Sequence, residues 1–300
     1  MPGDGRRALV TGALGFTGRT LVRQLQRRGY DVTGTSRRRS VDDAWARLDF
    51  SDGEAATALL EHAAPDVVFH LSGLARTYGP DLEAYRRANV LDTEALLTAL
   101  ARCRVGARLV LMSSAAVYAP PADGILSETA ALRPVSPYGR SKLEMEQRAA
   151  GFAADLSIAI ARPFNYTGPG QSEYFVAARI AGEAARGATT LVLGALTPRR
   201  EFNDVEAVAA SLVHLAETDH QGPVNIASGR ALSIQDLVDA TAQVLGRPLT
   251  ATSDPARLRA DDPPLIVGDP ALLTSLSCGL DQPPIGETIA RMLQASANSA

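Results

Sequence analysis

Residues 1–160 alternate short apolar runs with longer segments of helical periodicity, and this alternation constrains the fold more than any other feature of the chain. It predicts repeated βα units and a parallel sheet, because parallel strands need a long crossover that usually contains a helix. We expect helices to begin near residues 17, 53, 81 and 136, and strands at 8–11, 31–35, 46–48, 67–71, 108–112 and 157–161.

After residue 163 the sequence has more loops with Gly and Pro and alternates less regularly. We expect short strands at 191–193 and 224–226, and helices at 175–186, 205–217, 234–245 and 285–294. The predicted fold class is α/β, a Rossmann-type doubly wound parallel sheet with a smaller C-terminal lobe. We divide the chain into domains 1–165 and 166–300, and expect a segment near 202–228 to return to the sheet.

The turn after the first strand reads Thr11-Gly-Ala-Leu-Gly-Phe-Thr-Gly18. Its glycines permit a tight strand-to-helix turn, close approach of the backbone to a pyrophosphate, and close packing of the helix on the sheet. The phosphates would meet the N-terminus of that helix. A merely structural turn is the alternative. The position between a first strand and an amphipathic helix favours nucleotide binding by Gly12, Gly15, Phe16, Thr17 and Gly18.

The end of the second strand indicates the type of dinucleotide. A site that prefers NAD normally has an acidic residue there, whereas this chain reads Gly34-Thr-Ser-Arg-Arg-Arg39. Arg37 and Arg38 therefore favour a 2′-phosphate and hence NADPH/NADP, although a solvated turn is the alternative. Asp49, after the third strand, is either an adenine contact or a helix N-cap.

Tyr138 and Lys142 are four residues apart in Ser136-Pro-Tyr-Gly-Arg-Ser-Lys142. On a helix this spacing puts the phenol and the ammonium on one face, where the cation can lower the pKa of the phenol. Ser113 and Ser114 end the fifth strand, at the edge where open α/β sheets bind ligands. Ser114 could hold a substrate oxygen that Tyr138 protonates. Without the Tyr138/Lys142 pair, the two serines would predict only a turn.

Composition excludes several other classes of function. The formal net charge of −3 gives no general attraction for nucleic acid or an anionic membrane, and no apolar run approaches the length of a bilayer span. Only Cys103 and Cys278 are present, without a CxxC motif or a His cluster, so we expect no metal site. This cysteine usage, with an N-terminus that lacks the apolar stretch of a secretory signal, predicts a cytoplasmic protein.

The glycine-rich turn, Ser113-Ser114 and the Tyr138/Lys142 motif, in this order and spacing, resemble the extended short-chain dehydrogenase/reductase family. Three downstream motifs most resemble the GDP-4-keto-6-deoxy-D-mannose reductases of that family: Arg162-Pro-Phe-Asn165-Tyr-Thr-Gly-Pro-Gly-Gln171, Arg199-Arg-Glu-Phe-Asn-Asp204, and Ser253-Asp-Pro-Ala-Arg-Leu-Arg259-Ala-Asp-Asp262. The resemblance covers about residues 6 to 292. It implies an NADP-binding Rossmann domain (1–165) and a nucleotide-sugar substrate domain (166–300).

The resemblance also implies roles for individual residues. Tyr138 would be the general acid, Lys142 would bind the nicotinamide ribose, and Ser114 would hold the substrate carbonyl. The reaction would be NADPH-dependent reduction of the C4 keto group of a GDP- or dTDP-linked 4-keto-6-deoxyhexose. Further residues expected at the cofactor are Phe50, Leu71, Ser72, Gly73, Arg162 and Pro163. Those expected at the substrate are Asn165, Phe175, Val176, Arg200 and Arg259, of which Asn165, Arg200 and Arg259 would bind the diphosphate.

Three alternatives to a reductase are a 4,6-dehydratase, an epimerase and a non-catalytic protein. Related 4,6-dehydratases carry an Asp-Glu pair beside the catalytic hydroxyl residue, whereas Ala115-Ala116 stand here and offer no proton carriers. An NAD-dependent nucleotide-sugar epimerase and a non-catalytic NADP-binding protein are the remaining alternatives. Glu201 replaces the usual Asp, and Tyr166 stands where the reductases commonly have His, which leaves base and sugar open. By resemblance we expect a homodimer formed through the helix that bears Tyr138 and the helix before it.

Overall fold

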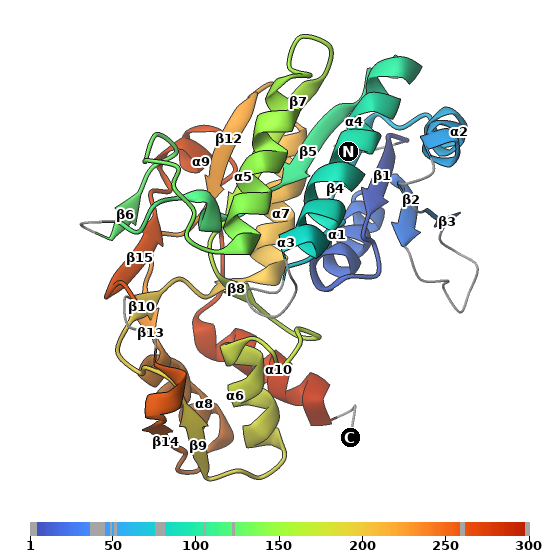
Figure 1. Cartoon of the computed structure of the whole chain (residues 1–300). Helices are drawn as coiled ribbons and strands as arrows, with labels where there is room; N and C mark the ends of the chain where they lie inside the picture. The colour runs from blue at the N-terminus through green and yellow to red at the C-terminus, as the bar shows by residue number, and fades with distance from the viewer. Residues whose placement is uncertain are drawn as a thin grey trace.

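The computed structural model describes residues 5–36, 46–48, 50, 53–75, 82–104, 106–121, 124–258 and 262–297. Its centre is a seven-stranded, wholly parallel sheet (Figure 1) with the order β12-β7-β5-β4-β1-β2-β3. The strands are β1 (Arg7–Thr11), β2 (Asp31–Ser36), β3 (Ala46–Arg47), β4 (Val67–His70), β5 (Arg108–Met112), β7 (Ser157–Pro163) and β12 (Gly222–Ile226).

Helices cover both faces of this sheet, and each face has its own hydrophobic cluster. One cluster includes residues of α1 (Phe16–Arg27), α7 (Val205–Ala216) and α9 (Ala271–Ser275). The other includes residues of α2 (Gly53–Ala63), α4 (Asp92–Cys103) and α5 (Pro137–Ala150). Because both faces are buried, the central strands are mostly apolar, as in residues 109–112 of β5.

The sheet order reverses between β1 and β4, which is where open α/β sheets bind ligands. Thr11, at the end of β1, lies opposite Thr35 of β2 and His70 of β4. The glycine-rich turn begins at this point and leads into α1. The first turn of α1 has no acidic residue and no side-chain cap, so its backbone N–H groups are available to an anion.

Helix α5 starts at a well-defined cap. The Ser136 side chain accepts a hydrogen bond from the backbone N–H of Gly139 (3.0 Å), and Pro137 occupies the first turn, where its missing N–H costs nothing. The buried face of the helix presents Tyr138, Ser141 and Lys142 to the carboxyl ends of the strands. The cap therefore fixes where the proposed catalytic helix begins.

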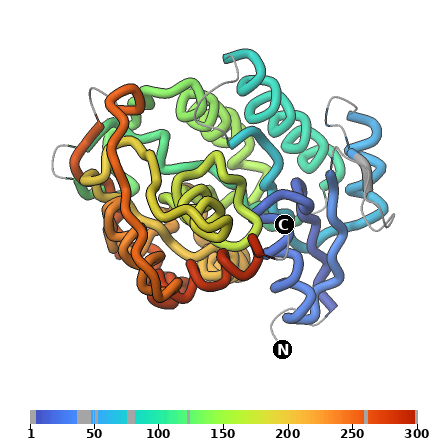
Figure 2. The backbone as a smooth tube through the Cα atoms, turned by 90° about the horizontal axis from the view of Figure 1, so that it is seen from below, coloured from blue at the N-terminus to red at the C-terminus, as the bar shows by residue number. Residues whose placement is uncertain are grey.

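The C-terminal part forms a further hydrophobic cluster, built mainly on α6 (Val176–Ala185), α8 (Ile234–Leu245) and α10 (Ile285–Ala297). Two strands pair beside it, β9 (Thr190–Leu193) and β14 (Thr250–Ser253). These elements lie together beyond the carboxyl ends of the large sheet, as the view from below shows (Figure 2). The division of the chain at residue 165 stays a prediction.

Short strands connect the two parts. A four-stranded sheet joins β13 (Leu232–Ser233), β10 (Arg199–Arg200), β15 (Leu265–Gly268) and β6 (Ile125–Leu126), so one of its strands comes from the first half of the chain. A two-stranded sheet pairs β8 (Tyr166–Thr167) with β11 (Asn203–Asp204). The polypeptide therefore passes repeatedly between the large sheet and the C-terminal helices.

The predicted fold class is confirmed. The six strands and three of the four helices expected before residue 163 are present with small shifts at their ends, while the residue 81 at which the fourth was to begin lies outside the described residues. That helix is described from α3 (Leu82–Tyr85), continues as a π-helical segment, η1 (Arg86–Leu91), and then as α4. The π-helical segment and the two-residue strands β6, β8, β10, β11 and β13 were not expected.

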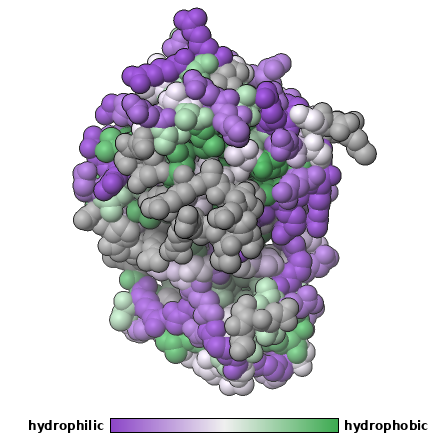
Figure 3. Space-filling model, turned by 90° about the vertical axis from the view of Figure 1, so that its right-hand side faces the viewer, coloured by the Kyte–Doolittle hydropathy of each residue, from purple (hydrophilic) through white to green (hydrophobic). Residues whose placement is uncertain are grey.

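On the face shown in Figure 3, hydrophilic side chains predominate and the hydrophobic ones are scattered among them. Within the part of the chain that the structure describes, no helix combines the length and hydropathy that a bilayer span requires.

Candidate active site

The glycine-rich turn forms a cradle that side chains would fill. Gly12 has a φ of +69°, and a Cβ placed on it would lie 3.0 Å from the backbone nitrogen of Ser72. A Cβ on Gly18 would overlap the carbonyl oxygen of Gly12. These positions need glycine because the turn, the loop after β4 and the start of α1 approach each other closely. The residues therefore fit a bound dinucleotide, with its phosphates at the N-terminus of α1.

The two predicted residues that follow this turn contact Tyr166 of β8. The Thr17 and Tyr166 hydroxyls are 2.8 Å apart, and the Phe16 and Tyr166 rings stack with centroids 5.8 Å apart. Tyr166 is the first residue of β8, which pairs with β11. It thus links the glycine-rich turn to the second part of the molecule.

Ser114, Tyr138 and Lys142 meet at the carboxyl end of β5. Ser114 caps the short 3-10 helix η2 (Ala115–Val117) by accepting a hydrogen bond from the backbone N–H of Ala116 (3.1 Å). Its hydroxyl also interacts with that of Tyr138. The Lys142 ammonium donates to the carbonyl of Met112, the last residue of β5 (2.8 Å). The structure brings the three predicted catalytic side chains into one group.

Burial dominates the electrostatics of this group. It raises the pKa of Tyr138, while the hydrogen bond from Ser114 opposes the rise. Burial lowers the pKa of Lys142 to about 8, while the charge of Glu146 opposes the fall. At neutral pH the phenol therefore carries its proton and most of the lysine is charged, which suits a proton donor beside a cation.

A buried chain of hydrogen bonds runs from β1 to the helix that follows β4. Thr93 donates to the carbonyl of Asn89 (2.9 Å), so its oxygen accepts from Nε2–H of His70 (2.9 Å). Nδ1 of His70 then carries no proton and accepts from the Thr11 hydroxyl (2.8 Å). The oxygen of Thr11 accepts from two backbone N–H groups of the loop after β4, those of Leu71 and Ser72. This chain fixes that loop against the glycine-rich turn.

Asn89 was missed by sequence reasoning. It lies in the π-helical segment η1 and is fully buried. Its side chain accepts from the N–H of Leu74 (2.8 Å) and donates to Ser141 (2.9 Å), whose hydroxyl donates to the carbonyl of Tyr138 (2.8 Å). It therefore ties the loop after β4 to the catalytic helix. No pattern in the sequence around it, Arg86-Arg-Ala-Asn-Val-Leu91, distinguishes this amide from an exposed polar residue.

Arg162, which we expected at the cofactor, has another role in the structure. Its side chain is 3 % exposed, and its guanidinium donates to Glu146 (2.6 and 3.0 Å), to the hydroxyl of Tyr118 (3.0 Å) and to the carbonyl of Glu128 (3.2 Å). Arg162 lies on β7, which pairs with β5 in the large sheet. The resemblance could not show that the side chain points into the protein interior.

The other residues predicted at the cofactor divide into three groups. Gly73 lies beside Lys142, because a Cβ on it would be 3.7 Å from the lysine nitrogen, and it follows Leu71 and Ser72 in the same loop. Phe50 is 3 % exposed and its ring packs edge-on against His70, so its side chain faces the core, and Pro163 is buried at the end of β7. Three predicted residues lie outside the described residues, namely Arg37, Arg38 and Asp49.

Apart from Ser114, the residues predicted to bind substrate lie at or after residue 165. Asn165 is exposed, while Phe175 and Val176, at the N-terminus of α6, are half-buried. Arg200 forms an ion pair with Asp262 (2.6 Å), a partner that sequence reasoning did not assign to it. Arg259 lies outside the described residues.

Glu201, which replaces the family's usual Asp, is a buried structural acceptor. Its carboxylate accepts from the side chain of Asn203 (2.6 Å) and from the backbone N–H groups of Ser228 (2.8 Å) and Gly268 (2.7 Å). It therefore joins the segment after β10 to the ends of β12 and β15. Nothing in this arrangement directs the carboxylate at a ligand.

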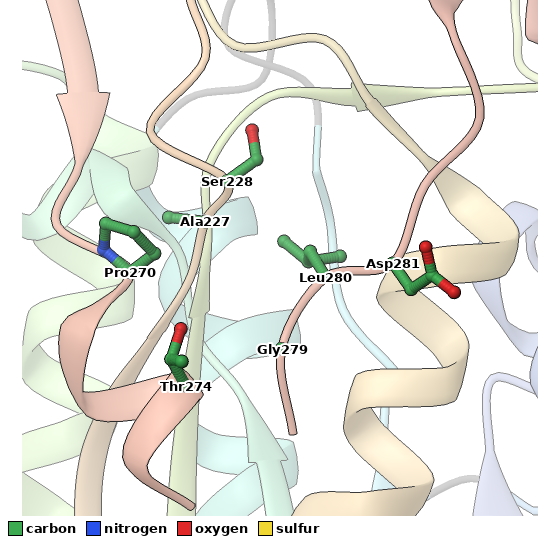
Figure 4. Close-up of a pocket in the computed structure, with 7 residues that line it drawn as sticks. All are labelled: Ala227, Ser228, Pro270, Thr274, Gly279, Leu280 and Asp281. Carbon is green, nitrogen blue, oxygen red and sulfur yellow. The ribbon is translucent and has the colours of Figure 1, made fainter. Parts of the chain in front are cut away.

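A hollow of about 340 Å³ lies beside the end of β12 and α9, at a different place from the catalytic group. Leu280 projects into it, while the carboxylate of Asp281 points away from the other labelled side chains (Figure 4). The residues that line it are Ala227, Ser228, Pro270, Thr274, Gly279, Leu280 and Asp281. Among the residues with described positions, no group of three or more His, Cys, Asp or Glu side chains could hold a metal ion.

Comparison with known proteins identifies the family. Residues 8–227 match the NAD dependent epimerase/dehydratase family. The chain belongs to this family. It is 31 % identical over 290 residues to GDP-6-deoxy-D-mannose reductase of Pseudomonas aeruginosa, and the match covers 89 % of this chain and 90 % of the relative. It is thus an enzyme of the NAD(P)-dependent nucleotide-sugar epimerase and reductase group, as the resemblance predicted.

Solved structures agree on the fold. A putative epimerase from Burkholderia cenocepacia superimposes with a TM-score of 0.90 at 34 % identity, covering 98 % of this chain and 99 % of the other. MoeE5 in complex with UDP-glucose and NAD superimposes with a TM-score of 0.84 at 32 % identity, and the match covers 99 % of each chain. RMD from Pseudomonas aeruginosa complexed with NADPH superimposes with a TM-score of 0.86 at 26 % identity, and the match covers 98 % of this chain and 100 % of the other. A nicotinamide dinucleotide is therefore the cofactor of this family enzyme, and both forms occur among its neighbours.

We predict that His70 makes this enzyme less stable in acid. Burial lowers the pKa of His70 to about 3, so between that pH and the unfolded value near 6.5 only the unfolded chain takes up a proton. From pH 7 to pH 5 the wild type should therefore lose about 2 kcal/mol more unfolding free energy than His70→Gln. Urea unfolding at both pH values measures the difference.

The control for this prediction is His62→Gln, which removes an exposed histidine on α2. It should lose as much stability as the wild type on acidification. Equal losses for the wild type and His70→Gln would contradict the role given to His70.

Proposed function

We propose that the enzyme uses NADPH to reduce the C4 keto group of a nucleotide-linked 4-keto-6-deoxyhexose. The observation that carries this proposal is the grouping of Tyr138 and Ser114 beside the Lys142 ammonium at the carboxyl end of β5. Ala115 and Ala116, the next residues after Ser114, offer no acid or base for dehydration. The overall similarity to GDP-6-deoxy-D-mannose reductase supports a 4-keto sugar as substrate.

The side chains divide the work as follows. Ser114 and Tyr138 would hold the carbonyl oxygen of the sugar through their hydroxyls. When bound, the reduced nicotinamide supplies the hydride. Tyr138 would give its proton to the oxygen as negative charge develops there, and Lys142 would stabilise the phenolate that remains. The raised pKa of Tyr138 keeps the proton in place until that moment.

Substrate binding would depend on the second part of the chain. Asn165, Phe175 and Val176 lie at the entrance to that part, and we assign them to the nucleotide sugar. Arg200 and Arg259 would bind the diphosphate, since guanidinium groups match phosphate oxygens in a fork geometry. For Arg200 this requires the diphosphate to compete with Asp262.

The first experiment follows NADPH oxidation with GDP- and dTDP-linked 4-keto-6-deoxyhexoses, each generated in place by its dehydratase. We expect oxidation with one of them, and a loss on the order of a hundredfold or more in Tyr138→Phe, because the proton donor is gone. The control Tyr30→Phe removes a hydroxyl bonded to Glu217, at the opposite edge of the sheet, and should retain the rate.

Two outcomes would contradict the proposal. If the reduction rate of Tyr138→Phe stays within a few-fold of the wild-type rate, Tyr138 is not the general acid. No oxidation with any sugar, together with interconversion of a UDP-sugar in the presence of NAD, would favour the alternative, an epimerase. The complex of MoeE5 with UDP-glucose and NAD makes that second assay worth running.

The preference for NADPH rests on Arg37 and Arg38. We expect Arg37→Ala to weaken NADPH binding far more than NADH binding, because only NADPH carries the 2′-phosphate. Titration of the cofactor fluorescence measures both affinities. The control Arg102→Ala removes an exposed cation on α4 and should leave the ratio unchanged. Equal losses of both cofactors in Arg37→Ala would contradict the 2′-phosphate argument.

We also propose that the enzyme is a homodimer formed through α4 and α5. Light scattering at micromolar concentration should give twice the chain mass. A monomer under these conditions would contradict this assembly without affecting the proposed chemistry.

A further inference from the structure

A buried ion pair lies directly behind the catalytic side chains. Glu146 is one helical turn after Lys142 on α5, and Arg162 is on β7. Nε of Arg162 is 3.0 Å from one carboxylate oxygen of Glu146 and Nη2 is 2.6 Å from the other. The exposed fractions of the two side chains are 3 % for Arg162 and 6 % for Glu146. This is the two-pronged geometry that holds a carboxylate most firmly.

Further bonds fix the carboxylate from the strand side. The Ser113 hydroxyl donates to Glu146, and the backbone N–H of Ser113 donates to the carbonyl of Ala161 (2.7 Å). Arg162 is held in turn by the Tyr118 hydroxyl, which donates to the side chain of Asn225 (2.6 Å). The position of Glu146 is therefore set by β5, β7 and β12 together.

Fold stability alone does not explain this arrangement. Removing two charges from water is costly, so a buried ion pair often stabilises a protein no more than apolar side chains of similar size. The groups that lie next to this ion pair indicate another role for it. Residues four apart on a helix share a face, so Glu146 lies under Lys142.

Lys142 is itself 5 % exposed, and its ammonium donates to the carbonyl of Met112. Among the residues that the structure describes, the ionisable groups near it include Glu146 and Tyr138 on its own helix and His70 on β4, with Arg162 behind Glu146. His70 is neutral, because burial and the nearby lysine lower its pKa to about 3. Glu146, although paired with Arg162, thus favours the charged form of Lys142 through its negative charge.

We propose that Glu146 is a positioning residue for the active site: held by Ser113 and Arg162, its carboxylate favours the charged form of Lys142, whose ammonium donates to the carbonyl that ends β5. The proposal rests on the proposed function only in that Lys142 acts in the reaction. Glu146 touches neither substrate nor cofactor and acts through Lys142.

The sequence offers a direct test, because Lys142 is the only lysine among the 300 residues. In protein labelled with ¹³C-lysine, one side-chain signal reports the protonation of Lys142 by NMR, without any substrate. We expect Glu146→Gln to move the midpoint of this titration down by about one pH unit, because an opposing charge has been removed.

The matched control is Glu144→Gln. Glu144 lies on the same helix, is 35 % exposed, and pairs with Arg86 and Arg148 on the surface. The same substitution there should leave the Lys142 titration at the wild-type midpoint. If the Lys142 titration has the same midpoint in Glu146→Gln and in Glu144→Gln, the proposal is overturned.

Glu146→Gln leaves Arg162 buried without its partner and could fail to fold. The double variant Glu146→Gln/Arg162→Met replaces both charges with neutral side chains of similar length, a change that buried pairs tolerate better. Its Lys142 midpoint should also fall, because Glu146 is the charge that acts on Lys142 and its loss outweighs that of Arg162, which lies behind it. A wild-type midpoint in this variant would contradict the proposal.

Activity gives an independent readout once a substrate is known. As the pH rises, kcat/KM of Glu146→Gln should decline earlier than that of the wild type, because Lys142 loses its proton at lower pH. A lower rate with an unchanged pH profile would indicate a merely structural role. If no sugar is reduced by the wild type, the proposed function fails, but the lysine titration still decides the role of Glu146.

Discussion

The active site depends on how α5 is attached to the large sheet. The helix packs through apolar side chains such as Met145 and Ala149. Two buried charged side chains fix its position along the sheet. Lys142 reaches the carbonyl that ends β5, and Glu146 reaches Ser113 and Arg162 on the neighbouring strands. Any rotation or slide of α5 would break these bonds in a water-poor interior, where unpaired charges are costly. The same contacts that dock the helix therefore aim Tyr138.

Much of the fold could be predicted because its signals are local. The strand Arg108–Met112 and the helix Ile234–Leu245 were expected within the bounds they have, since apolar runs and helical periodicity mark both. The two-residue strands outside the large sheet could not be predicted. β10 exists because β13 and β15 lie beside it, and β15 is more than sixty positions away in the chain. The π-helical turn before Asp92 likewise has no periodic signature.

The residues of the site likewise differ in whether a local sequence pattern identifies them. The glycine-rich turn and the Tyr138/Lys142 step are short motifs whose spacing carries their geometry. Asn89 acts through partners 15 and 52 positions away, and no local pattern identifies them. Arg162 shows the limit of resemblance, because a motif gives the position of a residue and not the direction of its side chain.

The hydrogen-bond chain through His70 has a consequence for the movement of protons. It starts at backbone N–H groups, passes through Thr11, His70 and Thr93, and ends at the carbonyl of Asn89. Peptide groups neither release nor accept protons near neutral pH, so the chain is closed at both ends. This chain can therefore conduct no proton to the group formed by Ser114, Tyr138 and Lys142. If Tyr138 is the general acid that we propose, its proton must return by a route other than this chain.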